Sequence, residues 1–394
     1  MDDEKPLVVY LIAGEASGDL LGAHLMRSLK AQSTRPLYFY GVGGEKMTAE
    51  GLTSLFPYYE LSMLGFLEIL PYLFNIFARI SRTVEDIRFK HPDVVITIDV
   101  PGFNFRIVER LRKENVSCKF IHYVAPTVWA YKPHRAELCA KLFDHMLVLL
   151  PFEPPYFTQV GLACTWVGHP VIAETKSGNG AAFRQKYEIP ETTPLFCLLP
   201  GSRKGEVERH MPIFAKAIAL LAGQFPNLAM AVAVPKNVMP FVAPFFDKCP
   251  FRAVVMTDEQ DKKDAIAASQ VAIVKSGTVA LEVAKAGIPM IVTYRVHPIS
   301  AWMFKRISLT KYVNLINILS KKEIIPELLQ ELCHPLMIAS AAAHLLTHPK
   351  HREQQLAQEK VALDQLLLPH NELPSDKAAK TILNIMSHCN KTET

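Results

Sequence analysis

The sequence predicts an α/β fold in which two doubly wound domains face a cleft and are followed by C-terminal helices. Short runs of Val, Ile and Leu recur without alternating polar residues, which is typical of strands buried on both faces of a parallel sheet. Helical patterns lie between these runs, so the order is βαβα. The chain has 394 residues, which is longer than a single hydrophobic core usually supports and favours two domains.

The first series of strands and helices occupies residues 1–170. Leu21, Leu25 and Leu29 recur every fourth residue after the first apolar run, which indicates a helix. We expect this domain to end near Gly168-His169-Pro170 and to be completed by a C-terminal helix over about 370–394. Its expected strands are PLVVYLIAG, LYFYGVGG, DVVITID, CKFIHYV and HMLVLL.

The second series occupies residues 171–369. It follows a polar, glycine-containing stretch, ETKSGNGAAFRQKYEIPETTP, that separates the two domains. From about residue 326 onward the pattern is helical. The expected strands are LFCLLPGS, LAMAVAV, AVVM, VAIVKSG and PMIVTY.

Composition narrows the class of protein. Apolar residues make up 49% of the chain and charged residues 21%, which favours a globular fold over disorder. A net charge of +5 does not indicate a nucleic-acid partner, but it is compatible with an anionic membrane or phosphorylated ligands. Seven scattered cysteines without C-x-x-C predict neither a disulfide framework nor a zinc site. The opening residues lack the cationic region and cleavage site of an export signal, so we expect a cytoplasmic protein.

The most apolar stretch is MLGFLEILPYLFNIFARI, residues 63–80. It does not predict a membrane span, because it contains Glu68, Asn75 and Arg79 and is expected to break into two short elements at Pro71. Two interpretations remain: a helix of the hydrophobic core, and an apolar surface that binds at the membrane interface. That surface would consist of Met63, Leu64, Phe66, Leu67, Leu70, Leu73, Phe74 and Phe77.

The loop AGEASGD, residues 13–19, joins the first strand to the first helix. Its small residues allow close approach of a ligand to the backbone, and a helix N-terminus favours negative charge. It matches neither the dinucleotide motif nor the P-loop motif. The alternative is a tight turn in which one carboxylate only complements the helix. The candidate contacts are Gly14, Glu15, Ser17, Gly18 and Asp19.

The second domain opens with a basic loop in LLPGSRKGEVERH, residues 198–210. Gly201, Ser202, Arg203 and Lys204 bring a glycine turn, a hydroxyl and two cations to the end of a strand. This chemistry suits a cluster of anionic oxygens such as a diphosphate. A solvated basic turn is the alternative.

A second loop of that domain lies in VAIVKSGTVALEVAKAGIPMIV, residues 271–292. Ser276, Gly277 and Thr278 open a helix, and Glu282 lies one turn beyond Thr278 on the same face. A diphosphate at the start of this helix would bring a ribose or sugar hydroxyl close to Glu282. The alternative is a surface glutamate on an amphipathic helix.

A nucleotide-diphosphate donor on the second domain and another substrate on the first is the layout of two-domain glycosyltransferases. Transfer to a hydroxyl needs a general base, and Asp99 in ITIDVPGFNFRI follows a buried strand and precedes a rigid turn. An aspartate that only caps this turn is the alternative. The sequence has no D-x-D, and His344 and His348 lack further ligands, so we predict no metal site.

Five motifs together resemble, in order and spacing, the lipid-A-disaccharide synthases of Gram-negative bacteria. They are GEASGD, IDVPGFN, HYVAPTVWAYKPHRA, LLPGSRKGEVERH and SGTVALEVAKAGIP, and the resemblance runs from about residue 8 to 320. It implies an inverting GT-B glycosyltransferase with two Rossmann-like domains, the first for the lipid acceptor and the second for the UDP-sugar donor. The implied reaction joins UDP-2,3-diacylglucosamine to 2,3-diacylglucosamine 1-phosphate (lipid X), giving UDP and the β-1,6-linked lipid A disaccharide 1-phosphate of lipopolysaccharide biosynthesis, without cofactor or metal.

The resemblance also implies roles for individual residues. Asp99 would be the base, Arg203 and Glu282 would contact UDP, and Asn317 in KYVNLINIL would lie near the donor, although Ile316 stands where the family more usually has proline. For Trp129 a packing role is the alternative to a head-group contact. The motif HYVAPTVWAYKPHRA would offer a charged lipid head group the side chains of Tyr123, Trp129, Lys132 and Arg135.

The implied location is the cytoplasmic leaflet of the inner membrane, to which the protein would bind peripherally. The implied partners are the two lipid substrates and not nucleic acid, and a homodimer stays open. Two rival functions are a UDP-N-acetylglucosamine 2-epimerase or another UDP-GlcNAc-dependent GT-B enzyme, and a non-catalytic glycolipid carrier. The apolar segment argues against the epimerase, and a carrier would not need Asp99, Arg203 and Glu282.

Overall fold

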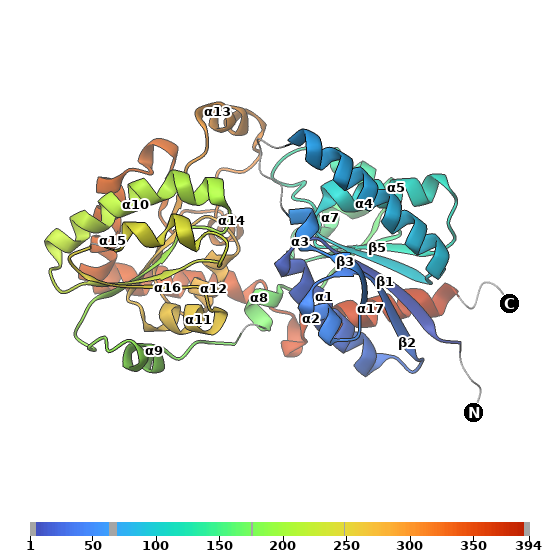
Figure 1. The fold of residues 1–394 in the computed structure, drawn as a ribbon, viewed down its shortest axis with the longest axis horizontal. Coiled ribbons are helices and arrows are strands. Elements are labelled where there is room, and N and C mark those ends of the chain that lie inside the picture. The colour runs from blue at the N-terminus through green and yellow to red at the C-terminus, as the bar shows by residue number, and fades with distance from the viewer. Residues whose placement is uncertain (1–4, 63–68, 175, 248, 390–394) are drawn as a thin grey trace. The chain divides into compact units, whose positions relative to one another are not determined.

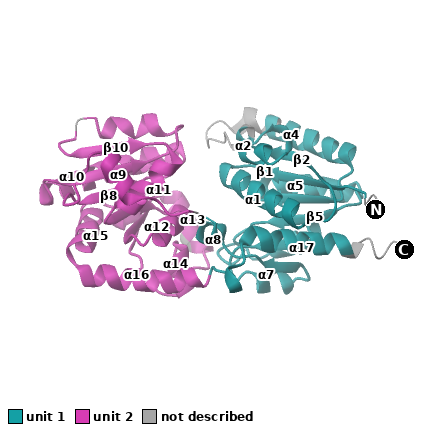
Figure 2. Ribbon diagram, turned by 90° about the horizontal axis from the view of Figure 1, so that it is seen from below, with its two compact units in different colours: residues 1–174, 366–394 teal, residues 175–365 magenta. Residues whose placement is uncertain are grey.

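The computed structural model describes residues 5–62, 69–174, 176–247 and 249–389, which form two compact units (Figures 1 and 2). Unit 1 comprises residues 1–174 and 366–394, and unit 2 comprises residues 175–365. Each unit contains a parallel sheet with helices on both faces, which confirms the predicted fold class. Within the described parts of the chain, no helix is both long and apolar enough to cross a membrane.

The sheet of unit 1 has, within the described residues, seven parallel strands in the order β3-β2-β1-β4-β5-β6-β7. The order reverses between β1 and β4, so the loops that follow these two strands meet at the carboxyl edge of the sheet. The strands are β1 (Leu7–Ala13), β2 (Leu37–Gly43), β3 (Thr53–Pro57), β4 (Val94–Ile98), β5 (Lys119–Tyr123), β6 (His145–Val148) and β7 (Ala163–Trp166).

Two layers of helices cover this sheet. Apolar side chains of α4, α5, α6 and α7 pack on one face, and those of α1, α2 and α17 pack on the other. The helices are α1 (Ala16–Gln32), α2 (Glu45–Ala49), α3 (Tyr59–Ser62), α4 (Ile69–Lys90), α5 (Pro101–Lys113), α6 (Arg135–Leu142), α7 (Pro154–Thr158), α8 (Pro170–Ala173) and α17 (Pro374–Cys389), with a 3₁₀ turn η4 (Pro369–Asn371).

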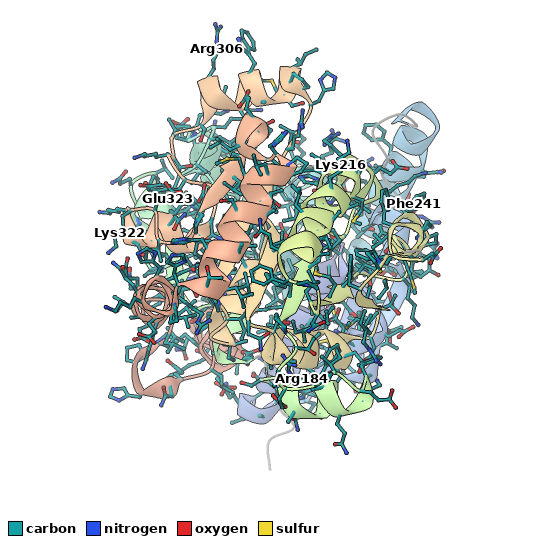
Figure 3. The ribbon with its side chains drawn as sticks, turned by 90° about the vertical axis from the view of Figure 1, so that its left-hand side faces the viewer. Arg184, Lys216, Phe241, Arg306, Lys322 and Glu323 are labelled. Atoms are coloured by element: carbon teal, nitrogen blue, oxygen red, sulfur yellow. The ribbon has the colours of Figure 1, made fainter. Side chains whose placement is uncertain are left out.

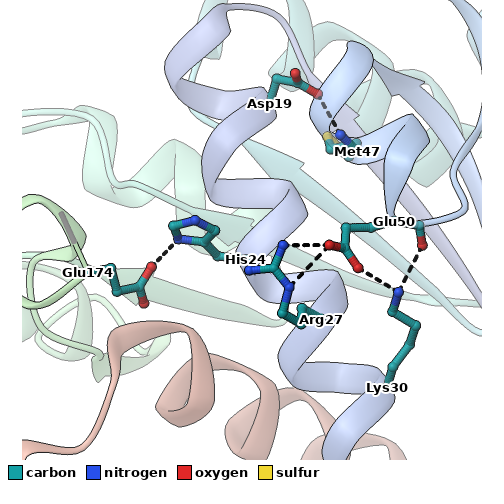
Figure 4. A network of polar contacts seen from close by, with 7 residues as sticks. All are labelled: Asp19, His24, Arg27, Lys30, Met47, Glu50 and Glu174. Atoms are coloured by element: carbon teal, nitrogen blue, oxygen red, sulfur yellow. Dashed lines mark hydrogen bonds and ion pairs between the residues drawn. The ribbon is translucent and has the colours of Figure 1, made fainter. Parts of the chain in front are cut away.

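The C-terminal helix α17 lies against α1, so the chain returns to unit 1 after building unit 2 (Figure 1). Glu174 links three helices there: its carboxylate accepts a hydrogen bond from the Ser375 backbone N–H at 2.9 Å and pairs with His24 of α1 (Figure 4). The side chain of Glu174 is largely buried, and its contacts with His24 and Ser375 outweigh the effect of burial and lower its pKa. Sequence reasoning did not identify this link.

Helix α4 corrects one expectation. Pro71 does not divide the apolar stretch; it is the third residue of α4, where a missing N–H and a fixed φ are tolerated. Farther along, Ile80, Val84 and Ile87 are buried at helical spacing in the core of unit 1. The second half of α4 is therefore a core helix.

The sheet of unit 2 has, within the residues described, six parallel strands in the order β10-β9-β8-β11-β12-β13. Its order reverses between β8 and β11, which places the loops after these strands side by side. The strands are β8 (Leu195–Leu199), β9 (Ala229–Ala233), β10 (Arg252–Met256), β11 (Val271–Lys275), β12 (Met290–Tyr294) and β13 (Glu327–Leu329).

Helices α10 and α15 share one core with this sheet, and α11 and α12 lie on its other face (Figure 1). The helices of unit 2 are α9 (Gly180–Lys186), α10 (Lys204–Gln224), α11 (Glu259–Ala268), α12 (Val279–Lys285), α13 (Pro298–Ile307), α14 (Leu315–Ser320), α15 (Pro335–Thr347) and α16 (Pro349–Asp364), with 3₁₀ turns η1 (Met239–Phe241), η2 (Ala243–Phe245) and η3 (Gln330–Leu332).

Candidate active site

In unit 1, two of the predicted motifs meet where the strand order reverses. Gly14 follows β1 and Val100 follows β4, and these strands are neighbours. A Cβ atom at Gly14 would lie 2.9 Å from Cγ2 of Val100, closer than real Cβ atoms approach. The close packing of the two loops therefore requires glycine at this position.

The backbone at Asp99 is strained. Asp99 has φ 50° and Val100 has φ 43°, so two consecutive L-residues adopt the left-handed region, where a β-branched residue is a genuine outlier. Neighbours hold the turn: the Asp99 N–H donates to the Tyr123 carbonyl at 2.9 Å, and Asn104 Nδ2 donates to the Asp99 carbonyl at 2.6 Å. Such strain persists only where the surroundings enforce it, and here it fixes the backbone of the half-buried Asp99 at the sheet edge.

Asn104 supports this turn from within the core, and sequence reasoning did not single it out. Its side chain is fully buried, and Nδ2 also lies 3.3 Å from the Ile98 carbonyl. Its Oδ1 has no hydrogen-bond partner among the described residues. Burying an unpaired oxygen costs free energy. The hydrogen bonds that Nδ2 donates to the backbone around Asp99 offset this cost.

Asp19 serves the fold directly. Its buried carboxylate accepts backbone N–H bonds from Gly44 at 2.7 Å and from Lys46 and Met47 at 3.1 Å (Figure 4 shows the bond to Met47). These are amides at the start of α2, so Asp19 caps a helix other than its own. In the same loop Ser17 is exposed and Glu15 half-buried; a ligand contact by this loop stays a prediction.

The loop after β5 divides its predicted residues between core and surface. Tyr123 was expected to offer its side chain to a lipid head group, and the structure contradicts this: the side chain is buried between the sheet and the layer of α1 and α17, where burial raises the pKa of its hydroxyl. Lys132 is exposed, and half-buried Arg135 donates to the Tyr131 hydroxyl at 3.3 Å. Only the second part of the motif is available to a ligand.

Trp129 is held in this loop by a buried acid. The indole N–H donates to Oε1 of Glu153 at 3.0 Å, and Oε2 of Glu153 accepts the Leu150 N–H at 3.0 Å. The Trp129 ring also meets the ring of Phe152 edge-on. Burial raises the pKa of Glu153 to about 7, against the pull of these two donors.

In unit 2, the basic loop and the loop after β11 meet where the strand order reverses. Glu206, in the first turn of α10, accepts from Lys275 Nζ at 2.9 Å and lies 3.9 Å from an Arg203 nitrogen. Glu206 and Lys275 are largely buried, whereas the Arg203 side chain is mostly exposed. Gly201 has φ 115°, a conformation that glycine alone adopts readily. The N-terminus of a 21-residue helix and cations from two loops thus gather at one edge.

Glu282 has a partner that the sequence did not reveal. Lys262 of α11 lies 3.0 Å from Glu282 and 2.8 Å from Glu259. Burial acts to lower the pKa of Lys262, but the two carboxylates prevail and raise it. Near this pair, Ser276 is half-buried, and Gly277 and Thr278 are exposed at the start of α12.

A buried histidine, His210, stabilises the same edge of the sheet of unit 2. His210 Nδ1 donates to the Glu206 carbonyl at 2.7 Å, and its Nε2 accepts the Arg295 N–H at 2.9 Å. Both ring nitrogens are thereby used by a neutral imidazole, whose pKa is lowered chiefly by burial. His210 ties the first turn of α10 to the end of β12.

Asn317 is fully engaged within the fold. It is buried, Nδ2 donates to the Ile325 carbonyl and to Glu327 Oε1 at 2.8 Å, and Oδ1 accepts from Ile324 and Ile325 at 2.8 and 2.9 Å. An amide side chain has no further hydrogens to donate. The structure therefore shows Asn317 organising residues 313–327; a direct donor contact stays a prediction that no contact here supports.

The predicted lipid surface is described only in part. Met63, Leu64, Phe66 and Leu67 lie outside the described residues. The side chains of Leu70, Leu73 and Phe74, in the first turns of α4, are also outside the description. Phe77 is 51% exposed, with the Arg106 guanidinium 5.4 Å from its ring.

Comparison with known proteins decides the family. A family profile described as "Lipid-A-disaccharide synthetase" matches residues 9–381. Relatives named lipid-A-disaccharide synthase are 42% identical in Rhodospirillum centenum, covering 97% of this chain and 96% of the relative, and 44% identical in Paramagnetospirillum magneticum, covering 96% and 98%. The relative in Rickettsia prowazekii is 41% identical, covering 95% and 98%.

The chain belongs to the lipid-A-disaccharide synthase family. This membership makes it an enzyme of the glycosyltransferase class and confirms the resemblance seen in the five motifs. It also favours the synthase over the epimerase and the carrier.

Solved structures show how widely the fold is shared. Similar ones include UDP-GlcNAc 2-epimerase from Neisseria meningitidis bound to UDP-GlcNAc (TM-score 0.61, 11% identity, 98% of this chain and 100% of that chain). Another is a glycosyltransferase from Rickettsia africae (TM-score 0.53, 11% identity, 98% of each chain). At these identities the likeness shows the fold alone.

The motifs placed the candidate residues in loops at the two strand reversals, but they did not reveal the contacts that hold these loops. Glu206 and Lys275 stand within quoted motifs, yet nothing local indicates that they pair across two strands. Lys262, Glu153 and Asn104 act through contacts that only the fold creates. No group of three or more His, Cys, Asp or Glu among the described residues is arranged to hold a metal ion.

Proposed function

We propose that the protein joins UDP-2,3-diacylglucosamine to 2,3-diacylglucosamine 1-phosphate, releasing UDP and forming the β-1,6-linked lipid A disaccharide 1-phosphate. One observation carries the proposal: a chain matching this family over residues 9–381 has a rigid carboxyl turn at one strand reversal and a cationic loop at the other. The first suits removal of a proton from the acceptor, and the second suits departure of a nucleoside diphosphate.

Asp99 is the proposed general base. It takes the proton of the acceptor hydroxyl as that oxygen forms a bond to the anomeric carbon of the donor, and the bond from that carbon to the diphosphate breaks. A single displacement converts the α-linked donor into a β-linked product. The strained turn serves this step because a catalytic group held in one orientation loses no freedom during the reaction.

The basic loop of unit 2 is the proposed diphosphate site. Negative charge grows on the leaving UDP, and Arg203, Lys204 and the first amides of α10 would stabilise it. Lys275 is already neutralised by Glu206, so its role is to fix the loop. Ser276, Gly277 and Thr278 would complete the donor site, with Glu282 at a sugar or ribose hydroxyl and Asn317 holding a segment near the donor.

Unit 1 is the proposed acceptor unit. Trp129, held by Glu153, would offer an apolar face beside the sugar, and Lys132 and Arg135 would bind the 1-phosphate.

The apolar stretch at the start of α4 would bind the cytoplasmic leaflet of the inner membrane. Phe77 of this helix is exposed and would contact the lipids. Flotation with vesicles tests this: a folded Phe74→Ser/Phe77→Ser variant should bind less, and undiminished binding would return the segment to the core.

The direct test is incubation of the protein with both lipid substrates in the presence of a chelator, followed by mass spectrometry. We expect disaccharide 1-phosphate and UDP in equal amounts. Binding of both lipids without product would favour a carrier. Conversion of UDP-N-acetylglucosamine to its 2-epimer without disaccharide would favour the epimerase.

A further inference from the structure

Helix α13 of unit 2 lacks the packed face that normally stabilises a short helix. Among its residues with described burial, which exclude Lys305, none is buried, and only Ser300 and Ala301 are half-buried. A helix of ten residues is marginal in water unless one face is covered. Figure 1 shows α13 at the periphery of unit 2, apart from the helices that pack on its sheet.

The exposed side of α13 is apolar. Ile299, Trp302, Met303 and Ile307 follow the spacing i, i+3, i+4 and i+8, so they lie on one side of the helix. All four are exposed, Ile299 at 71% and Trp302 at 58%. Single exposed apolar residues are ordinary, but a contiguous group of this kind marks an interaction surface.

The sequence around this stripe carries positive charge only. Between residues 295 and 322 the sequence contains no Asp or Glu. The Arg306 guanidinium lies 4.0 Å from the centre of the Trp302 ring, and Figure 3 shows Arg306 projecting outward from α13. The cations of this segment are Arg295, Lys305, Arg306, Lys311, Lys321 and Lys322.

We propose that α13 is a second lipid-binding surface, which lies in the interface of an anionic bilayer and holds unit 2 there. Interfacial helices combine an apolar stripe and a tryptophan with lysine and arginine, and anionic head groups are the complementary charge for a segment without carboxylates. A protein partner would need a single surface that is both apolar, to cover the stripe, and acidic, to pair with the surrounding cations. The inference deepens the proposed function, because it places the sugar-donor unit itself at the lipid surface.

Tryptophan fluorescence isolates this surface from the rest of the molecule. The protein has three tryptophans, and Trp129 and Trp166 are half-buried with their N–H groups bonded to Glu153 and to the Leu149 carbonyl. Trp302 is the most exposed of the three. Vesicles of phosphatidylglycerol and phosphatidylethanolamine should therefore shift the emission to the blue, and brominated lipids should quench it. In Trp302→Phe both effects should be lost.

Two pairs of substitutions separate the apolar from the ionic contribution. Trp302→Ser/Met303→Ser should weaken partition to anionic vesicles roughly tenfold, because two interfacial side chains are removed. Arg306→Gln/Lys311→Gln should reduce the preference for anionic over phosphatidylcholine vesicles. The control is Leu220→Ser/Val361→Ser, which changes exposed apolar residues elsewhere in unit 2 and should bind like wild type.

Activity distinguishes failure of this inference from failure of the proposed function. Transfer between detergent-dispersed substrates should be unchanged in the α13 variants, because α13 contributes no proposed catalytic or UDP contact. Wild-type vesicle binding by a folded Trp302→Ser/Met303→Ser variant, or by Trp302→Phe with an intact blue shift, would overturn the inference. Loss of a dimer on sedimentation of the same variant, without loss of vesicle binding, would assign α13 to a second copy of the chain instead.

Discussion

The two strand reversals of this protein have the same topology and opposite chemistry. In unit 1 the loops after β1 and β4 meet through Gly14 and Val100, and the strained turn presents a carboxyl group. In unit 2 the loops after β8 and β11 meet through an ion pair between Glu206 and Lys275, beside an exposed arginine. The comparison shows that the same topology places different side chains at a sheet edge, a carboxyl group in unit 1 and cations in unit 2, and the proposed division of roles rests on this difference.

Glu153 of unit 1 and Glu206 of unit 2, both largely buried, also differ in their partners. The carboxylate of Glu153 in unit 1 accepts hydrogen bonds from two N–H groups, those of Trp129 and Leu150, and burial raises its pKa to about 7. Glu206 of unit 2 accepts from Lys275 at 2.9 Å. A buried carboxyl group can therefore be accommodated by a proton in one place and by a cation in the other.

The largest expected effect comes from removing the proposed base of unit 1. Asp99→Asn keeps the size of the side chain and abolishes its basicity, so turnover should fall by roughly two to four orders of magnitude. Steady-state rates with detergent-dispersed substrates measure this. Turnover close to wild type would remove Asp99 from the proposed role.

The next effect concerns the cation of unit 2. Arg203→Gln should raise the KM for the UDP donor by about ten- to a hundredfold, which corresponds to losing a charge-assisted hydrogen bond of about 1.5–3 kcal/mol. Arg252→Gln is the matched control, because Arg252 is an exposed arginine of the edge strand β10. An equal rise in both variants would mean that only general electrostatics is involved.

Glycine substitutions sharpen the comparison between the loops. Gly14→Ala forces a Cβ against Val100, and at about 1–3 kcal/mol for overpacking we expect turnover to fall roughly tenfold with the donor KM preserved. Gly201→Ala places a side chain at φ 115° and should instead raise the donor KM. Gly102→Ala has no atom within 4 Å of the added Cβ and is the control. The same kinetic change in Gly14→Ala and Gly201→Ala would contradict the division between the units.

The last prediction concerns the pH dependence of stability rather than activity. The pKa of Glu153 is raised in the folded state, so its contribution is fully present below its ordinary value of 4.5 and is lost as pH rises through about 7. Between these two pH values the free energy of unfolding falls by at most about 3 kcal/mol because of this group. Glu153→Gln, which mimics the protonated form, should therefore lose less thermal stability than wild type between pH 5 and pH 8.

Thermal melts followed by tryptophan fluorescence, to which Trp129 contributes, measure this difference. Glu109→Gln is the control, because Glu109 is an exposed glutamate of unit 1. Parallel pH profiles for wild type and Glu153→Gln would contradict the assigned shift.

The sequence predicted the fold because its strongest signals are local. Uninterrupted apolar runs such as β4 marked strands buried on both faces, and each glycine-containing motif fell in a loop after such a strand. The partners of those loops could not be predicted, because Lys275 with Glu206, and Glu282 with Lys262, are contacts between separate elements. Tyr123 was misplaced because a strand's last residue points either into the core or toward the edge, and the sequence does not say which.

The most direct test of the division between the two units is calorimetric titration of UDP into wild type, Asp99→Asn and Arg203→Gln. If unit 1 supplies the base and unit 2 binds the diphosphate, Asp99→Asn should bind UDP within about twofold of wild type, and Arg203→Gln should bind at least about tenfold more weakly. Equal weakening in both variants, or weakening in Asp99→Asn alone, would contradict it.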